Sequence, residues 1–159
     1  MNVEQLKAGD AILYNGEMTI MRDAAQKRLG QSQRSLIDLK DKIVFYAGPA
    51  KTPAGAVVGA IGPTTSARMD PYLEMLFKMG VKATVGKGER SQYVKDLCRQ
   101  YKGVYFLAPS GSAAALSQCV VNHEILLFEE LQSEAIQRIL VKAFPLLVAI
   151  DSTGSAIWA

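Results

Sequence analysis

Two hydrophobic periodicities follow each other along the chain. In residues 11–14 and 17–21, apolar side chains flank an Asn15-Gly16 pair, and an Asn-Gly pair between short apolar segments is a strong signal for a β-hairpin. From Asp23 the apolar positions recur with helical spacing as far as Leu36 and Leu39, with basic residues between them and a break near Gly30. The pattern therefore predicts an N-terminal β-hairpin followed by a helix.

Beyond this helix, short apolar segments typical of strands alternate with segments of helical periodicity. The expected strands are residues 43–47, 57–61, 83–85, 104–108, 125–128 and 146–150. The expected helices are residues 72–79, 93–101, 113–118 and 134–140. Such alternation favours a largely parallel sheet flanked by helices, and the N-terminal hairpin makes the sheet mixed. We expect a layered α/β fold in a single domain over residues 1–159.

The composition is that of an ordinary globular protein. Of the 159 residues, 49% are hydrophobic and 21% are charged, and a chain of this length can bury about 70% of its unfolded surface. The 18 basic and 15 acidic residues give a net charge of +3 and are scattered, without the basic stripe of nucleic-acid-binding proteins. Neither a membrane-spanning segment nor a secretion signal is evident. We expect a cytoplasmic protein that binds neither nucleic acid nor membranes.

The cysteines limit the chemistry that the chain can perform alone. Cys98 and Cys119 stand apart, outside any CxxC pattern, and we expect both to behave as small buried hydrophobic residues. An iron-sulfur cluster with an open iron needs about three thiolates. If the protein works with a metal cluster, the ligands must therefore lie on another chain. His123 is the only histidine, and we expect it to be structural or exposed.

The segment 62–71, Gly-Pro-Thr-Thr-Ser-Ala-Arg-Met-Asp-Pro, combines three hydroxyl side chains with Arg68. It follows the expected strand 57–61, and Asp70-Pro71 has the form of a helix N-cap and first helical residue. Residues 64–68 then form a strand-to-helix loop, where α/β proteins bind ligands. Hydroxyls, amides near a helix start and an arginine suit a carboxylate or a phosphate. The alternative is a capping loop in which Arg68 is only solvated.

Two further glycine-containing loops have the same strand-to-helix placement. Residues 85–91 hold Lys87 between two glycines, which let the backbone approach a ligand, although the spacing is not that of a Walker A loop. Residues 110–112 form the other loop. Arg22 lies in a charged group where the hairpin is expected to meet the first helix. Alternatively, the two loops are polar surface turns and Arg22 is an ordinary surface charge at a helix start. No Ser-His-Asp or Cys-His arrangement is evident, so we predict a binder of anions more than a self-sufficient catalyst.

Several segments together resemble the C-terminal domain of class I iron-sulfur fumarases and the β subunit of two-subunit fumarate and tartrate dehydratases. The most specific segment is GPTTSARMDPY, which GKGERSQYVKDLC follows. The others, in the order that this family shows, are RDAAQKRL, YAGPAK, GSAAALSQ and FEELQSEAIQRILVKAFPLLVAIDSTG. The resemblance covers nearly the whole chain.

This resemblance implies a swivelling-type β/β/α domain. It also implies that the chain is one subunit of a hydro-lyase that reversibly dehydrates a 2-hydroxy dicarboxylic acid, with malate and fumarate as the leading pair. The four-iron four-sulfur cluster of that family sits on a partner α subunit, which fits the cysteine count here. The residues that match the family's substrate contacts are Arg22, Thr64, Arg68 and Lys87. Among them, Thr64 and Arg68 match catalytic positions, with Thr64 at that of a threonine proposed as the proton-transfer base.

Two departures from the family pattern bear on these expectations. Gln26 replaces the histidine common in the RDAA segment, which weakens any role for that position. Gly88-Glu89 replaces the Gly-Gly of tartrate-type members, which favours a fumarase. An L(+)-tartrate dehydratase β subunit and a non-catalytic anion-binding module that kept the fold stay open as alternatives, and so does self-association.

Overall fold

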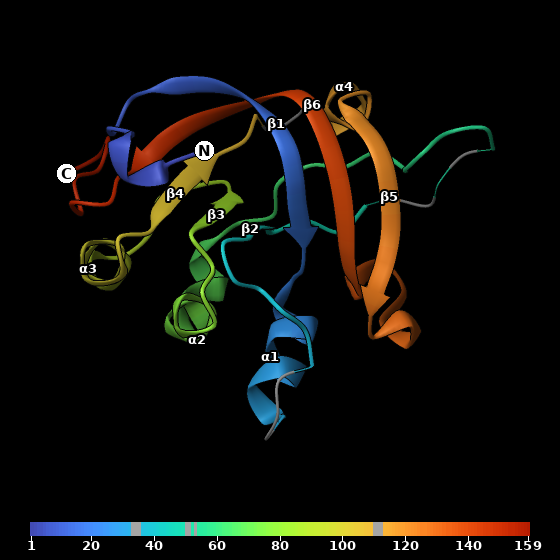
Figure 1. The fold of residues 1–159 in the computed structure, drawn as a ribbon, viewed down its shortest axis with the longest axis horizontal. Helices are drawn as coiled ribbons and strands as arrows, with labels where there is room; N and C mark the ends of the chain where they lie inside the picture. The colour runs from blue at the N-terminus through green and yellow to red at the C-terminus, as the bar shows by residue number, and fades with distance from the viewer. Residues whose placement is uncertain (33–35, 50–51, 53, 110–112) are drawn as a thin grey trace.

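A computed structural model describes residues 1–32, 36–49, 52, 54–109 and 113–159. Its one sheet has the strand order β1-β2-β3-β4-β6-β5, and β1 also pairs with β6. This pairing closes five strands into a ring, and β5 lies outside the ring against β6 (Figure 1). The strands are β1 (Ala11–Ile20), β2 (Ile43–Phe45), β3 (Ala83–Gly86), β4 (Val104–Leu107), β5 (Val120–Leu127) and β6 (Ile136–Ile150).

Short helices lie in the segments between the strands, except for η1, which precedes β1. The α-helices are α1 (Asp23–Gln31), α2 (Leu73–Lys78), α3 (Gln92–Tyr101) and α4 (Ala113–Ser117). The 3-10 helices are η1 (Val3–Gln5), η2 (Ala67–Tyr72) and η3 (Glu129–Glu134). Helices α2 and α3 lie together beside β3 and β4, whereas α1 leaves the end of β1 (Figure 1). None of the helices in the described ranges is long and apolar enough to span a membrane.

The predicted N-terminal hairpin is wrong. Residues 11–20 form one continuous strand, which pairs antiparallel with β6 and shifts register between Tyr14 and Gly16. Gly16 has φ +150°, and the side chain of Asn15 accepts a hydrogen bond of 2.8 Å from the Ala143 amide on β6. The Asn-Gly pair therefore makes a bulge within a strand. Its turn propensity is overridden because β1 gains a ladder of hydrogen bonds with a distant segment.

Two more predicted elements are wrong. Residues 57–61 form no strand, and of residues 134–140, expected as a helix, residues 136–140 belong to the long strand β6. Strand β6 pairs with β1, β4 and β5, all antiparallel. The sheet is thus mixed, as predicted, but not largely parallel, because only the pairs β1–β2, β2–β3 and β3–β4 are parallel. The other predicted strands and helices are present, with shifted ends, except that α1 ends at Gln31 and the expected helical continuation to Leu36 and Leu39 is absent from residues 36–39.

Alternating residues of β2 belong to two different hydrophobic clusters. Ile43 and Phe45 of β2 face the interior of the ring, where the Phe45 ring meets Phe144 of β6 edge-on at 5.6 Å. Val44 and Tyr46 point the other way and pack against α1 and α2. The period of two along a strand makes this division possible. Strands β2, β3 and β4 are buried on both faces, and the segments that follow them start from fixed positions.

Candidate functional site

The ends of three parallel strands lie in one row. Ile20 of β1 pairs with Phe45 of β2, and Phe45 pairs with Val85 of β3. Because the strands are parallel, the residues that follow them leave the sheet at the same edge, where α/β proteins bind ligands. Arg22 follows β1 and Lys87 follows β3. The sheet thus brings two of the predicted site residues to one edge.

The loop that carries Thr64 runs between the continuations of β2 and β3. The Thr64 amide donates a hydrogen bond of 2.7 Å to the carbonyl oxygen of Tyr46, and the Ser66 amide donates one of 3.0 Å to that of Lys87. Thr65 also forms a parallel bridge with Lys87. Backbone pairing therefore holds Thr64 and Lys87 on adjoining segments, although they lie 23 positions apart in the printed sequence.

Arg22 is half-buried between two loops. Its Nε lies 3.8 Å from Oε1 of Glu134, and 30% of its side chain is exposed. A Cβ on Gly48 would lie 3.0 Å from Nη1 of Arg22, so this glycine leaves room for the guanidinium. The buried Nε has no hydrogen-bond partner within the described ranges, and the group retains donors for a ligand.

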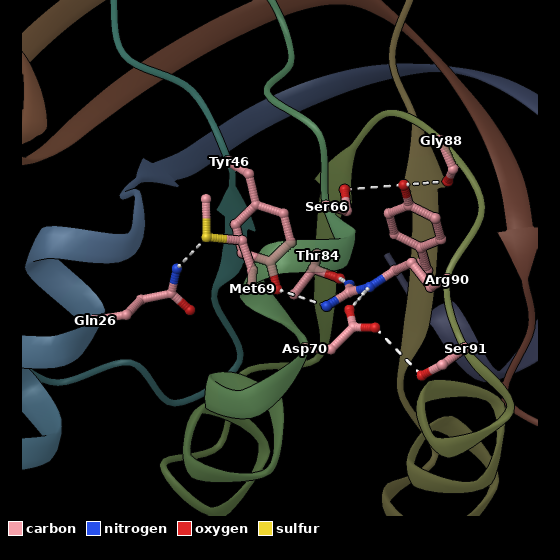
Figure 2. A network of polar contacts seen from close by, with 10 residues as sticks. Gln26, Tyr46, Ser66, Met69, Asp70, Thr84, Gly88, Arg90 and Ser91 are labelled. Carbon is pink, nitrogen blue, oxygen red and sulfur yellow. Dashed lines mark hydrogen bonds and ion pairs between the residues drawn. The ribbon is translucent and has the colours of Figure 1, made fainter.

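Arg68 is paired with the residue next to Arg22. Its Nε lies 3.5 Å from Oδ2 of Asp23, the first residue of α1, and the two side chains are 45% and 43% exposed. The same two elements, α1 and η2, are also in contact where Nε2 of the buried Gln26 lies 3.3 Å from Sδ of Met69 (Figure 2). Helix α1 and the segment 64–69 are therefore packed together, which places Arg68 near the start of α1.

The edge presents three cations and one hydroxyl, on Arg22, Arg68, Lys87 and Thr64. Lys87 is exposed and makes no ion pair with the described residues, and no hydrogen bond or ion pair in the described part of the chain joins these four side chains to one another. Guanidinium groups can hold carboxylates through two parallel hydrogen bonds. The arrangement therefore suits a small ligand with more than one carboxylate. Exposure weakens such contacts, and a covering surface would strengthen them by excluding water.

A buried arginine that the sequence did not single out lies behind this edge. Arg90 is 4% exposed. It donates from Nε to Asp70 Oδ1 at 2.7 Å, from Nη1 to Thr84 Oγ1 at 3.1 Å and from Nη2 to the Tyr46 hydroxyl at 3.3 Å (Figure 2). Burial opposes its charge, but Tyr46 and the Asp70 carboxylate more than compensate, and the pKa of Arg90 is raised. The group is a permanent buried cation.

This contact corrects the role predicted for Asp70. Asp70 does not cap a helix; it lies inside η2, and α2 begins after Tyr72 without a side-chain cap. Its carboxylate binds Arg90 and accepts a hydrogen bond of 3.2 Å from the Ser91 hydroxyl. The local sequence Asp-Pro is typical of a cap, whereas the partner Arg90 lies 20 positions away and leaves no local signal.

The described residues do not fit a metal cluster. Cys98 is buried between α3 and β4, and burial is the main reason that the pKa of its thiol is raised to about 12. Cys119 is half-buried, with Sγ 3.8 Å from the carbonyl oxygen of Ala143. No group of three or more His, Cys, Asp or Glu side chains in the described ranges could hold a metal ion. Two separated thiols cannot ligate an iron-sulfur cluster.

Two other features that the sequence analysis considered are His123 and the glycine-containing loop at residues 110–112. His123 lies on β5, with Nε2 2.6 Å from Oε1 of Gln137 on β6; because an amide oxygen only accepts, Nε2 carries the proton in this hydrogen bond. The candidate loop at residues 110–112 lies outside the described residues.

The chain is similar to known proteins over its whole length. The model of the family described as Fumarase C-terminus matches residues 1–159. The anaerobic class I fumarate hydratase of Escherichia coli is 37% identical over 163 residues, which cover 96% of this chain and 29% of that protein. The aerobic class I fumarate hydratase of Salmonella typhimurium is 35% identical over 159 residues, which cover 96% of this chain and 27% of that protein.

A third relative is of similar length. A putative L(+)-tartrate dehydratase subunit beta from Methanocaldococcus jannaschii is 36% identical over 167 residues, which cover 99% of this chain and 86% of that protein. This chain thus spans less than a third of the two fumarate hydratases but most of a protein named as a separate subunit.

Proposed function

The chain belongs to the Fumarase C-terminus family, and from that premise we propose that it is the β-type subunit of an iron-sulfur-dependent hydro-lyase. The proposed reaction is the reversible dehydration of a 2-hydroxy dicarboxylic acid, with malate and fumarate as the pair. The proposal extends to a single swivelling-type β/β/α domain over residues 1–159. It also extends to a cytoplasmic location, which the two free thiols support.

The observation that carries the proposal is the gathering of charge at one sheet edge. Arg22 and Lys87 follow β1 and β3, Arg68 lies in the 3-10 helix η2, and Thr64 lies on the same edge. A dicarboxylate carries two negative charges at neutral pH. Three cations, two of them with planar forks, can bind both of its carboxylates and still leave the reacting carbons free.

Within this proposal the four residues divide the work. Arg22, Arg68 and Lys87 hold the substrate, and Arg68 stabilises the charge that develops on a carboxylate as the C3 proton leaves. Thr64 moves that proton. A threonine hydroxyl is a weak base, so this role requires the neighbouring cations to lower its pKa in the complex.

We propose that a partner α subunit supplies the iron-sulfur cluster and covers the edge. The two separated cysteines support a cluster held elsewhere, and the exposure of Arg68 and Lys87 supports a covering partner. Large apolar side chains are also exposed, among them Leu13 at 67% and Val121 at 58%. A permanent complex would bury about 2,000 Å² or more.

L(+)-tartrate is a second candidate substrate. It is favoured by the relative named a putative L(+)-tartrate dehydratase subunit beta, of which this chain covers 86%. Malate and tartrate differ by one hydroxyl group, and both carry two carboxylates. The same cations would serve either substrate.

Anaerobic co-expression of this chain with a candidate α chain tests the proposal. We expect a complex that elutes as one species, contains iron and sulfide, and dehydrates malate or L(+)-tartrate. This chain purified alone should contain neither iron nor sulfide and should show no activity; the α chain alone is the matching control for activity.

Two results would contradict the proposal. Stoichiometric iron and sulfide in this chain alone would reject a divided site. A complex that binds malate without turning over malate or tartrate would favour the alternative of a non-catalytic anion-binding module.

A further inference from the structure

The segment that carries Thr64 and Arg68 and the loop that carries Lys87 are joined by a buried polar network. Arg90 belongs to the loop of Lys87 and follows Lys87 by three residues. It binds Asp70, which follows Arg68 by two residues in the other segment. Arg90 also donates a hydrogen bond to the hydroxyl of Tyr46, and the backbone carbonyl oxygen of Tyr46 accepts a hydrogen bond from the Thr64 amide. One guanidinium therefore contacts both segments and the residue that anchors Thr64 (Figure 2).

A second connection runs through Tyr105 of β4. Its hydroxyl lies 2.9 Å from Oγ of Ser66 and 2.8 Å from the carbonyl oxygen of Gly88. The hydroxyl has one proton and the carbonyl only accepts, so Tyr105 donates to Gly88 and Ser66 donates to Tyr105. The Arg90 guanidinium lies over the rings of Tyr105 and Tyr46, at 4.9 and 5.2 Å from their centroids. The two connections therefore form one packed unit.

Stability alone does not account for a charge at this position. A buried ion pair usually contributes little net stability, because desolvation offsets the attraction. A guanidinium does, however, fix the directions of several partners at once through its planar donors. All three nitrogens of Arg90 are used in this way, toward Asp70, Thr84 and Tyr46.

We propose that Arg90 is a positioning residue: together with Tyr105, it fixes the segment of Thr64 and Arg68 relative to the loop of Lys87. It does not contact the substrate, because its side chain is fully buried. The catalytic consequence rests on the proposed function, since it assumes that Thr64, Arg68 and Lys87 act on one substrate. The structural consequence, which is the ordering of the two segments, does not depend on it.

Amide hydrogen exchange on this chain tests the structural consequence. The amides of Thr64 and Ser66, which donate to Tyr46 and Lys87, should exchange at least about tenfold faster in Arg90→Lys. Lysine keeps the charge but lacks the fork that binds three partners. The Val104 amide donates a hydrogen bond to the carbonyl oxygen of Lys82 where β3 and β4 begin, at the opposite end of these strands from Lys87. It is the internal control, and its exchange rate should change little.

A milder pair of variants guards against loss of the fold. Tyr105→Phe removes only the hydroxyl that joins Ser66 to Gly88. Tyr101→Phe is its match, because it removes a hydroxyl that binds Glu74 at 3.1 Å on α2, outside the network. We expect faster exchange at Ser66 in Tyr105→Phe and no change there in Tyr101→Phe.

Steady-state kinetics of the assembled enzyme test the catalytic consequence. A displacement of about 1 Å can cost about 10²-fold in rate, and we expect kcat to fall about 10- to 100-fold in Arg90→Lys and less in Tyr105→Phe. Unchanged exchange at Thr64 and Ser66, or acceleration of every amide in proportion, would overturn the inference. Normal kcat in both variants, despite faster exchange, would also overturn it. If the wild-type complex is inactive on malate and tartrate, the proposed function fails, and the exchange data still decide whether Arg90 orders the segments.

Discussion

Gly86 and Ser66 lie so close together that a methyl group on Gly86 would overlap the Ser66 hydroxyl oxygen. The same methyl group would lie 3.2 Å from the carbonyl oxygen of Thr64. The absence of a side chain at the end of β3 is therefore what allows the Thr64 segment to lie against the sheet.

Gly86→Ala should consequently damage both stability and activity. Overpacking a buried site typically costs about 1–3 kcal/mol, and displacement of Thr64 should lower kcat of the assembled enzyme by about 10²-fold. Urea denaturation and steady-state kinetics measure the two effects. Gly30→Ala is the matched control: its Cβ would only touch Met75 Sδ at 3.4 Å, and alanine should stabilise α1 by about 0.5–1 kcal/mol. A Gly86→Ala enzyme with normal stability would contradict this account.

Gly48→Ala should separate activity from stability. The new Cβ would lie 3.0 Å from Nη1 and 3.1 Å from Cδ of Arg22, and 3.3 Å from the carbonyl oxygen of Ser133. The Arg22 side chain is 30% exposed and can move aside at little cost, whereas the Ser133 backbone has to shift by only a few tenths of an ångström. We expect the free energy of unfolding to change by less than about 1 kcal/mol, whereas KM for the dicarboxylate rises because Arg22 is displaced. An unchanged KM would argue that Arg22 does not contact the substrate.

Arg68→Ala in the assembled enzyme should lower kcat by about 10²- to 10³-fold, by analogy with the loss of one oxyanion donor. Arg68→Lys should also impair kcat, because lysine lacks the planar fork. Melting should stay nearly unchanged, since substitution of an exposed surface residue usually stays within about 0.5 kcal/mol.

Arg99→Ala is the control for Arg68. Arg99 is 65% exposed and pairs with Asp96 at 3.3 Å, much as Arg68 pairs with Asp23. The Arg99 variant should retain full activity. Full activity of Arg68→Ala would remove Arg68 from the proposed site.

Because Cys98 is buried, we expect the folded protein to lose stability at alkaline pH. Burial raises the pKa of its thiol from an ordinary 9.0 to about 12. Between these values the unfolded chain releases a proton that the folded chain keeps, so the free energy of unfolding falls as the pH rises above about 9. Tyr105, whose pKa is raised to about 12 chiefly by burial, adds to the fall above about pH 10.

Urea denaturation between pH 7 and pH 10 measures this effect. The decline from pH 9 to pH 10 should be smaller in Cys98→Ala than in the wild type, and Cys119→Ala should retain it. An equal decline in the wild type and Cys98→Ala would assign the effect to other groups.

Local chemistry let the sequence predict much of this protein. The spacing of apolar residues identified α2, α3 and β2–β4, because each is a short element whose period is visible within its own residues. The predicted site residues Arg22, Thr64 and Lys87 fall on connections at one sheet edge, because parallel strands end at a common edge, and Arg68 follows in η2. The segments GPTTSARMD and GKGERS also carried the resemblance to the family to which the chain belongs.

Only the tertiary structure decided which local signals prevail. The Asn15-Gly16 pair became a bulge and residues 136–140 became strand because β1 and β6 pair along most of their lengths and close the ring. The role of Asp70 was likewise decided by Arg90, a partner that only the packing of η2 against the end of β3 brings within 2.7 Å. In each case, a contact between distant residues outweighs a local preference, since a local propensity is a weak term beside a buried ladder or a buried charge that needs its partner.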